Sequence, residues 1–222
     1  MIKNLGACMK SLVLVWLVLL CSSLHAKEYG LHFDDSGNII KPDREYLVRG
    51  MGDEKDGFRD SAMKNFMKAA EFGNYHAMSL VGLYHMQDKN YVAAHAWFNL
   101  IDLAQIPNRA YLEELIGNLE VMLTAEQLKE AQEMKAELAE TYGSYPAMLR
   151  REAWKKSLKF TGTHIKGYIP PFLRIRLNSG MEVTGHEVRK QVDNFIYNYE
   201  FDFGQGEVTL DEIELIEVDE EQ

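Results

Sequence analysis

The segment Ala94-His-Ala-Trp97-Phe98 repeats a pattern found 32 residues earlier, in Ala62-Met-Lys-Asn-Phe66. In both segments an alanine precedes a phenylalanine by four positions, and helix-forming residues continue the chain beyond it. A fixed period of about 20–50 residues is typical of stacked helical hairpins, each of which buries its apolar face against the next. We therefore expect a helical hairpin array, an architecture that presents a surface for binding.

Apolar spacing and capping residues set the helices expected between residues 56 and 142. The first runs near 58–72, with Asp60 or Ser61 as its cap and Gly73 just beyond its end, where glycine readily adopts a left-handed conformation. Asn74 can cap the second helix. The third, near 91–104, has the spacing of one buried stripe in Ala94, Trp97, Phe98 and Ile101.

Two more helices follow in the same region. A fourth helix is expected to bury Tyr111, Leu115, Leu119 and Met122. Residues Thr124-Ala-Glu-Gln127 form a capping box that opens a fifth. The positions expected to hold the hairpins together are Phe66, Gly73, Ala77, Gly82, Ala94, Trp97 and Phe98.

The array resembles the Sel1-like repeat, a relative of the tetratricopeptide repeat, over about residues 56–140. The resemblance rests on Lys68-Ala-Ala-Glu-Phe-Gly73-Asn74, Ala77-Met-Ser-Leu-Val81-Gly82-Leu-Tyr84 and Asn90-Tyr-Val-Ala-Ala94-His-Ala-Trp97-Phe98-Asn-Leu100. It departs from the family at His85, where tyrosine is usual. Only about two repeats are present, so flanking segments have to close the array.

The resemblance implies a binding groove lined by the first helix of each hairpin. The residues that could line it are His76, Ser79, Leu83, Gln87, Glu114 and Asn118. The alternative is that these side chains form an ordinary solvated helix face. A protein or peptide of the cell envelope would be the partner.

The first 26 residues have the pattern of a secretory signal peptide. Lys3 and Lys10 precede a short apolar run, 12–20, and the segment closes at Ala26. The run is about half the length that a spanning helix needs. A retained anchor or a lipoprotein attachment at Cys21 are the alternatives. The signal predicts a periplasmic or secreted protein without a transmembrane helix in its mature chain.

Composition narrows the chemistry of the mature chain. Both cysteines, Cys8 and Cys21, lie in the signal segment, which excludes disulfides, a cysteine nucleophile and thiolate metal sites after export. Residues 27–222 contain 22 Lys/Arg against 34 Asp/Glu, and such an acidic chain does not attract nucleic acid through its overall field. We expect neither a cofactor nor a metal ion.

The remaining segments complete an α+β fold class, a short α-helical hairpin array followed by a small β-rich C-terminal module. Residues 27–55 are expected to be irregular, 56–142 to hold the repeats, and 143–160 to form a basic amphipathic helix or linker. The β-rich module spans 161–222. Its strands are expected at 173–177, 181–184, 196–203 and beyond 207, with a short helix at 188–195.

A basic and aromatic stretch, 150–176, stands out in this acidic chain because it holds eight Lys/Arg and one acid. Its candidate binding residues are Trp154, Lys155, Lys159, Arg174 and Arg176. Two interpretations remain open: pairing with the acidic segment 207–222, or binding of an anionic partner such as a glycan or a lipid head group.

No catalytic motif emerges. His76, His85 and His95 are nine and ten residues apart, which does not place them on one helix face for a metal ion. The segment that begins at His186 resembles a zinc-protease helix, but Lys190 occupies the second histidine position. We therefore expect no enzyme. The main hypothesis is a non-catalytic periplasmic adaptor and the alternative is an envelope glycan-binding or anionic-ligand-binding protein; a hydrolase using His164 or His186 is a distant third.

Overall fold

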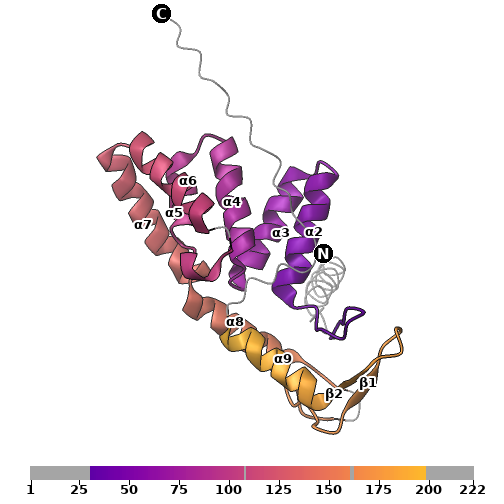
Figure 1. The fold of residues 1–222 in the computed structure, drawn as a ribbon. Helices are drawn as coiled ribbons and strands as arrows, with labels where there is room; N and C mark the ends of the chain where they lie inside the picture. The colour runs from indigo at the N-terminus through magenta and orange to yellow at the C-terminus, as the bar shows by residue number, and fades with distance from the viewer. Residues whose placement is uncertain (1–30, 108, 161–162, 199–222) are drawn as a thin grey trace, which may run out of the picture.

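The computed structural model describes residues 31–107, 109–160 and 163–198. These ranges are mostly helical, with one small antiparallel sheet near the C-terminal end, which confirms the α+β class at this level (Figure 1). The signal segment, most of the strand expected at 196–203 and the acidic segment 207–222 lie outside the described residues. The elements in chain order are α2 (Pro42–Lys55), α3 (Arg59–Glu71), α4 (Tyr75–Gln87), α5 (Tyr91–Phe98), the 3-10 helix η1 (Leu103–Gln105), α6 (Arg109–Met122), α7 (Ala125–Tyr142), α8 (Ser144–Ser157), β1 (Arg174–Arg176), β2 (Glu182–Thr184) and α9 (Gly185–Tyr197).

The first hairpin, α2–α3, begins earlier than the sequence suggested. The expectation of an irregular segment over 27–55 is wrong for 42–55, which forms α2. Pro42 and the acidic residues that follow it favour a helix start. The contact with α3 is made by Gly50, where a Cβ would come within 2.5 Å of the Phe66 ring. A helix that packs through a glycine shows little apolar periodicity in its sequence, so that periodicity does not predict the helix.

The second hairpin, α4–α5, is joined by the same kind of contact. A Cβ on Gly82 would lie 2.4 Å from the ring of Phe98, which is fully buried. The turns also match, because Gly57 and Lys89 both have positive φ, at 82° and 58°. Glycine and lysine therefore adopt the same left-handed backbone at positions 32 residues apart, although only glycine does so without strain.

Local signals place most helix boundaries. Gly73 has a φ of 79° and follows α3, and the Asn74 side chain caps α4 by accepting a hydrogen bond from the Ala77 amide at 2.9 Å. The capping residue expected for α3 is wrong, because Phe58 precedes the helix and no side chain caps it. The third helix ends at Phe98 instead of 104, yet its expected stripe is buried throughout: Ala94, Trp97, Phe98 and Ile101.

Helices α6 and α7 pack differently, because both contact α5 instead of pairing with each other. Of the stripe expected on α6, Tyr111 and Met122 are exposed, so that stripe is wrong at both ends. The residues that α6 buries are Leu112 and Leu119. The elements that α6 packs against are α5 and η1. Helix α7 also packs against α5, and the Trp97 and Tyr142 rings are 4.6 Å apart there.

The C-terminal module, residues 143–198, contains α8, the β1–β2 pair and α9, and has its own core. The expectation of a β-rich module is wrong for the described part, because α9 has 13 residues and each strand has three. Ile196 lies in the last turn of α9 and not in a strand. Thr184 and Glu187 form a capping box at the start of α9. The buried stripe that fixes this helix is Val188, Val192, Phe195 and Ile196.

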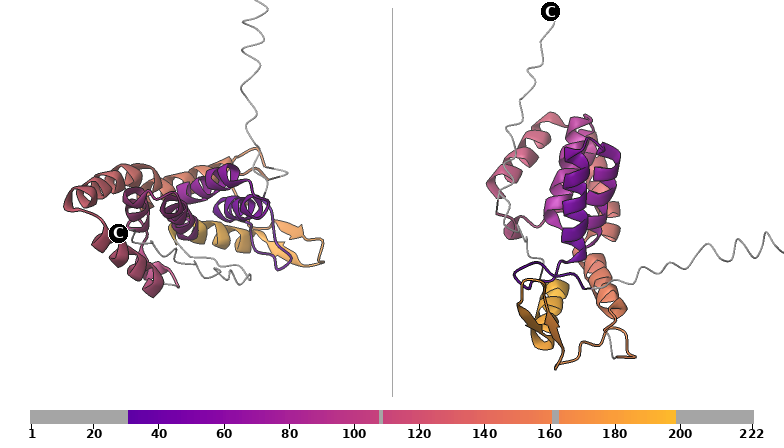
Figure 2. Two further views of the ribbon diagram at one scale, coloured as in Figure 1. Left: turned by 90° about the horizontal axis from the view of Figure 1, so that it is seen from above. Right: turned by 90° about the vertical axis from the view of Figure 1, so that its right-hand side faces the viewer.

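An N-terminal turn belongs to this module although it is distant in sequence. The Ile39 amide donates a hydrogen bond to Gln191 Oε1 at 2.6 Å, and Gln191 Nε2 donates to the Gly37 carbonyl at 3.0 Å. Ile39 is also part of the core around Trp154. Figures 1 and 2 show α9 and the strands at one end of the molecule, with α8 running from them toward the helical array, residues 42–142.

Candidate interaction surfaces

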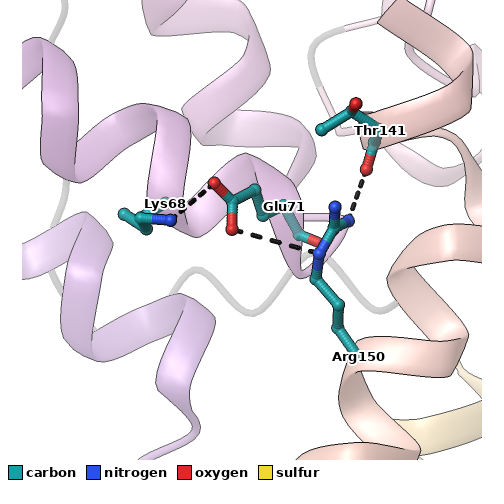
Figure 3. A network of polar contacts seen from close by, with 4 residues as sticks. All are labelled: Lys68, Glu71, Thr141 and Arg150. Carbon is teal, nitrogen blue, oxygen red and sulfur yellow. Dashed lines mark hydrogen bonds and ion pairs between the residues drawn. The ribbon is translucent and has the colours of Figure 1, made fainter. Parts of the chain in front are cut away.

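Two neighbouring arginines of α8 join the helical array to the C-terminal module. Arg150 donates hydrogen bonds to the carbonyls of Glu71, at 3.0 Å, and Thr141 (Figure 3). Its Nε lies 4.0 Å from Glu71 Oε2, and Lys68 Nζ lies 2.7 Å from Glu71 Oε1. These carbonyls lie at the ends of α3 and α7, where helices leave acceptors unsatisfied and favour positive charge.

Arg151 performs the same role on the other side and is almost fully buried. Its Nε donates to the Phe72 carbonyl at 2.6 Å, and its Nη1 donates to the carbonyls of Phe195, at 2.8 Å, and Asn198, at 3.1 Å. The guanidinium also lies 4.6 Å from the centre of the Phe195 ring. Two cations of the basic stretch are therefore structural, because they cap helix ends.

The predicted basic and aromatic patch does not form one surface. Trp154 is buried in the module core, with its ring edge-to-face against Phe195 at 5.2 Å. Lys155 Nζ lies 2.6 Å from Asp193 Oδ1, and Arg174 Nη1 lies 3.7 Å from Glu182 Oε2. Lys159 and Arg176 remain exposed. The printed ion pairs are with α9 and β2, so pairing with the acidic segment 207–222 stays untested.

Four residues of the predicted groove share one stripe of α4. His76, Ser79 and Leu83 are half-buried along it, and Gln87 is exposed at its end. Burial lowers the pKa of His76 to about 4, so its ring is neutral at pH 7. The Ser79 hydroxyl donates to the Tyr75 carbonyl at 3.0 Å, and Leu83 packs against the core of the array.

Gln87 is bound within the array. Its Oε1 accepts a hydrogen bond from Arg59 Nη1 at 2.6 Å. The same guanidinium lies 2.8 Å from Asp88 Oδ1 and 4.3 Å from the centre of the Tyr84 ring. This clamp holds the start of α3 on the end of α4, so the Gln87 side chain is partly committed to the fold.

The other two predicted groove residues lie elsewhere. Glu114 and Asn118 are exposed on α6, which packs mainly against α5 and η1. The structure therefore gathers the α4 residues of the predicted groove but does not join them to the α6 residues. The prediction assumed that α6 continues the stacking of the first two hairpins, but α6 packs mainly against α5 and η1.

A buried histidine that the sequence pattern does not predict lies between α5 and α6. His95 is 6% exposed, and its Nε2 lies 3.2 Å from the Asn99 side-chain nitrogen and 3.7 Å from Glu120 Oε1 on α6. Its place in the repeated Ala-His-Ala-Trp segment, among buried alanines, is the signal that could have found it. Across the described ranges, no group of three His, Cys, Asp or Glu side chains is placed to hold a metal ion.

Comparisons with known proteins add no family to these observations. The chain matches no family model, and searches of the curated proteins and of the solved structures found no match either. None of the described helices combines the length and the apolar character needed to cross a membrane. The function has therefore to be argued from the surfaces themselves.

Proposed function

We propose that this protein is a non-catalytic interaction adaptor of the cell envelope that holds a protein or peptide partner on a Sel1-like helical array. One observation carries the proposal: the contact between Gly50 and Phe66 recurs 32 residues later between Gly82 and Phe98. Two hairpins built on one plan support a tandem repeat, and tandem repeats serve mainly as extended binding surfaces.

The turns support the same conclusion. Gly57 and Lys89 share a left-handed conformation at the same 32-residue spacing, and each stands between the two helices of its hairpin. On this interpretation the first repeat is α2–α3 and begins at residue 42. Helices α6 and α7 both pack on α5 and close the array after its second hairpin, as an array of only two repeats needs for stability.

The stripe along α4 is the proposed binding face. The position 32 residues before Gln87 is Lys55 of α2, whereas Leu47, the position equivalent to Ser79, is buried. Lys55 and Gln87 are both exposed at the ends of their helices. Replacing Gln87 removes one hydrogen bond of Arg59 but leaves the contact of Arg59 with Asp88, so packing should change little. They are therefore suitable positions for a probe.

Site-specific photocrosslinking in the cell envelope tests the proposal. A photoreactive amino acid at Lys55 or Gln87 should capture the same partner, whereas the probe at Glu130, exposed on α7, should not. Equal capture from all three positions, or none from either face position, would contradict a partner on this face. Export is tested separately by fusing residues 1–30 to a reporter that is active only outside the cytoplasm.

The glycan-binding alternative gains no support from the aromatic residue that motivated it. A sugar-binding site usually exposes a ring for stacking, but Trp154 is 7% exposed and packs against Phe195. The positive charge of the C-terminal module is the remaining support for this alternative.

A further inference from the structure

Charge is divided unevenly between the described array and the described part of the C-terminal module. Residues 31–142 contain eleven Lys/Arg against nineteen Asp/Glu, whereas residues 143–198 contain ten against four. The strands and α9 lie at the end of the molecule away from most of the array (Figures 1 and 2). At physiological ionic strength charges are screened over about 8 Å. Within the described residues, the far end of the module therefore presents mainly positive charge.

The loop 163–173, which joins α8 to β1 at this end, exposes unusually large apolar side chains. Phe172 is 94% exposed, Ile165 is 65% exposed and Tyr168 is 47% exposed. Between them Ile169 is buried and fixes the loop on the module core. Large apolar groups exposed together in a short segment usually mark a binding surface.

The loop is held in a defined shape. The Gly167 amide donates to the Leu158 carbonyl at 2.7 Å, and the Leu173 amide donates to the Pro170 carbonyl at 3.2 Å. The second bond closes a turn that has Phe172 at its tip. Arg189 of α9 also donates to the Ile169 carbonyl at 2.9 Å. These bonds anchor the loop at several points, so its apolar side chains are presented from a fixed base.

Gly185, the first residue of α9, allows the helix to approach this turn. A Cβ at Gly185 would lie 1.9 Å from the Pro170 carbonyl oxygen, so no larger residue fits there. The backbone of the turn that precedes Phe172 is thus packed closely against the start of α9. An apolar side chain that the fold holds in solvent indicates a site that binds an apolar partner.

Exposed cations flank these apolar tips. Lys166 follows Ile165 directly, Lys156 lies beside Gly167 on the last turn of α8, and Arg176 ends β1 after the Phe172 turn. This set of cations does not include Arg150 and Arg151, which cap helix ends, or Lys155, which is paired with Asp193. Basic side chains around exposed aromatic and aliphatic groups are the pattern by which proteins bind the interface of anionic membranes.

We propose that the loop 163–173 docks the C-terminal module on an anionic phospholipid bilayer. Ile165 and Phe172 enter the interface between head groups and acyl chains, Tyr168 lies at head-group level, and Lys156, Lys166 and Arg176 contact lipid phosphates. A bilayer fits better than a glycan, because the loop tips offer apolar surface and few hydrogen-bonding groups. The acidic array stays away from the membrane. This proposal is independent of the partner held by α4.

Vesicle binding tests the proposal with the full chain after removal of the signal segment. Binding to phosphatidylglycerol-containing vesicles should exceed binding to pure phosphatidylcholine vesicles at least tenfold and should fall with added salt. Replacing Ile165 and Phe172 together by alanine should reduce binding about tenfold. Replacing Lys156 and Lys166 by glutamine should reduce both binding and its salt dependence.

Matched variants in the array provide the controls. Val121→Ala removes a side chain that is 88% exposed on α6, and Lys135→Gln removes an exposed charge on α7; neither should change binding. The Phe172→Trp substitution gives a direct signal. The fluorescence emission of the introduced tryptophan should shift to the blue, and brominated lipid should quench it, only with anionic vesicles.

Three results would overturn the proposal. One is equal binding to neutral and anionic vesicles, and another is the absence of a blue shift in the Phe172→Trp protein at low salt. The third is binding to a soluble anionic polysaccharide that survives the loss of Ile165 and Phe172, because the positive charge would then serve a glycan. None of these results bears on crosslinking from α4, so this proposal and the adaptor proposal can fail separately.

Discussion

The first two hairpins and helix α6 use glycine in opposite ways. In α2 and α4 a glycine faces a phenylalanine ring of the following helix. The rings of Phe66 and Phe98 occupy the volume that a side chain at Gly50 or Gly82 would need. In α6, Gly117 has no atom within 4 Å of the place where its Cβ would be. A glycine in a helix is thus a packing device only where an aromatic ring occupies the missing volume. Helix α6 lacks that device and packs mainly against α5 and η1.

Removal of a ring from the first two hairpins should have the largest effect on stability. Phe98→Ala should lower the free energy of unfolding by about 4 kcal/mol, because it empties a fully buried site, and Phe66→Ala should act alike. Urea denaturation measures both. Phe58→Ala is the control, since that ring is 62% exposed and its loss should cost under about 0.5 kcal/mol. Similar costs at Phe58 and Phe98 would remove the basis of the comparison.

Adding one methyl group tests the glycines directly. Gly82→Ala should destabilise the protein by about 2 kcal/mol, because the new Cβ would meet the Phe98 ring at 2.4 Å. Gly117→Ala should instead stabilise it by up to about 1 kcal/mol, since alanine is the better helix former and space is open. Thermal or urea unfolding gives the sign of each change. If both substitutions stabilise the protein, the close approach in α4 is not as drawn.

Substitution of Arg150, whose side chain binds the ends of α3 and α7, is a further test. Arg150→Met should cost about 1.5 kcal/mol, because the carbonyls of Glu71 and Thr141 lose a charged donor. Hydrogen exchange should quicken at the end of α7 while the α4–α5 hairpin keeps its protection. Lys156→Met, an exposed neighbour on the same helix, serves as the control and should leave exchange in α7 unchanged.

Acid should weaken the second hairpin more than its neighbours. Burial lowers the pKa of His76 from 6.5 to about 4, and burial also lowers the pKa of His85 despite the opposing effect of Asp88. The unfolded chain then binds more protons than the folded one, so stability is present above pH 6.5 and declines as the pH falls toward 4. His76 alone contributes a loss of about 1 kcal/mol between pH 6.5 and 5.5.

Chemical denaturation at several pH values measures this decline. His76→Gln should flatten the curve between pH 6.5 and 4, whereas His32→Gln, at an exposed position of the N-terminal turn, should not. A curve that keeps its slope in the His76→Gln protein would show that the acid sensitivity arises elsewhere.

Local chemistry was readable in the sequence, and this explains which parts of the fold were predicted. Gly73, Asn74 and Thr124 act on neighbours within a few residues, and the structure has each of them in the expected role. The repeated alanine and phenylalanine positions are buried as predicted. By contrast, α2 was missed because its contact with α3 depends on the absence of a side chain at Gly50, which apolar periodicity does not register.

The candidate sites were harder, because they depend on distant partners. Trp154 had the appearance of a binding residue until Phe195, 41 positions later, covered its ring. Glu114 was placed in a groove on the assumption of regular stacking, and α6 does not continue it. Phe172 is in sequence only one of the aromatic residues of the basic stretch 150–176. Its exposure in the loop before β1 is a property of the folded chain that no sequence pattern predicts.

The hydrogen bonds of Gln191 to the N-terminal turn have a consequence for the order of folding. They join residues 152 and 154 positions apart, so this joint forms only after the chain has closed a loop that contains the entire array. The hairpins depend on local contacts and close fast, whereas distant pairings close slowly. We expect the array to fold first and the C-terminal module last. Pulse-labelled hydrogen exchange during refolding should then protect α3 and α4 before α9.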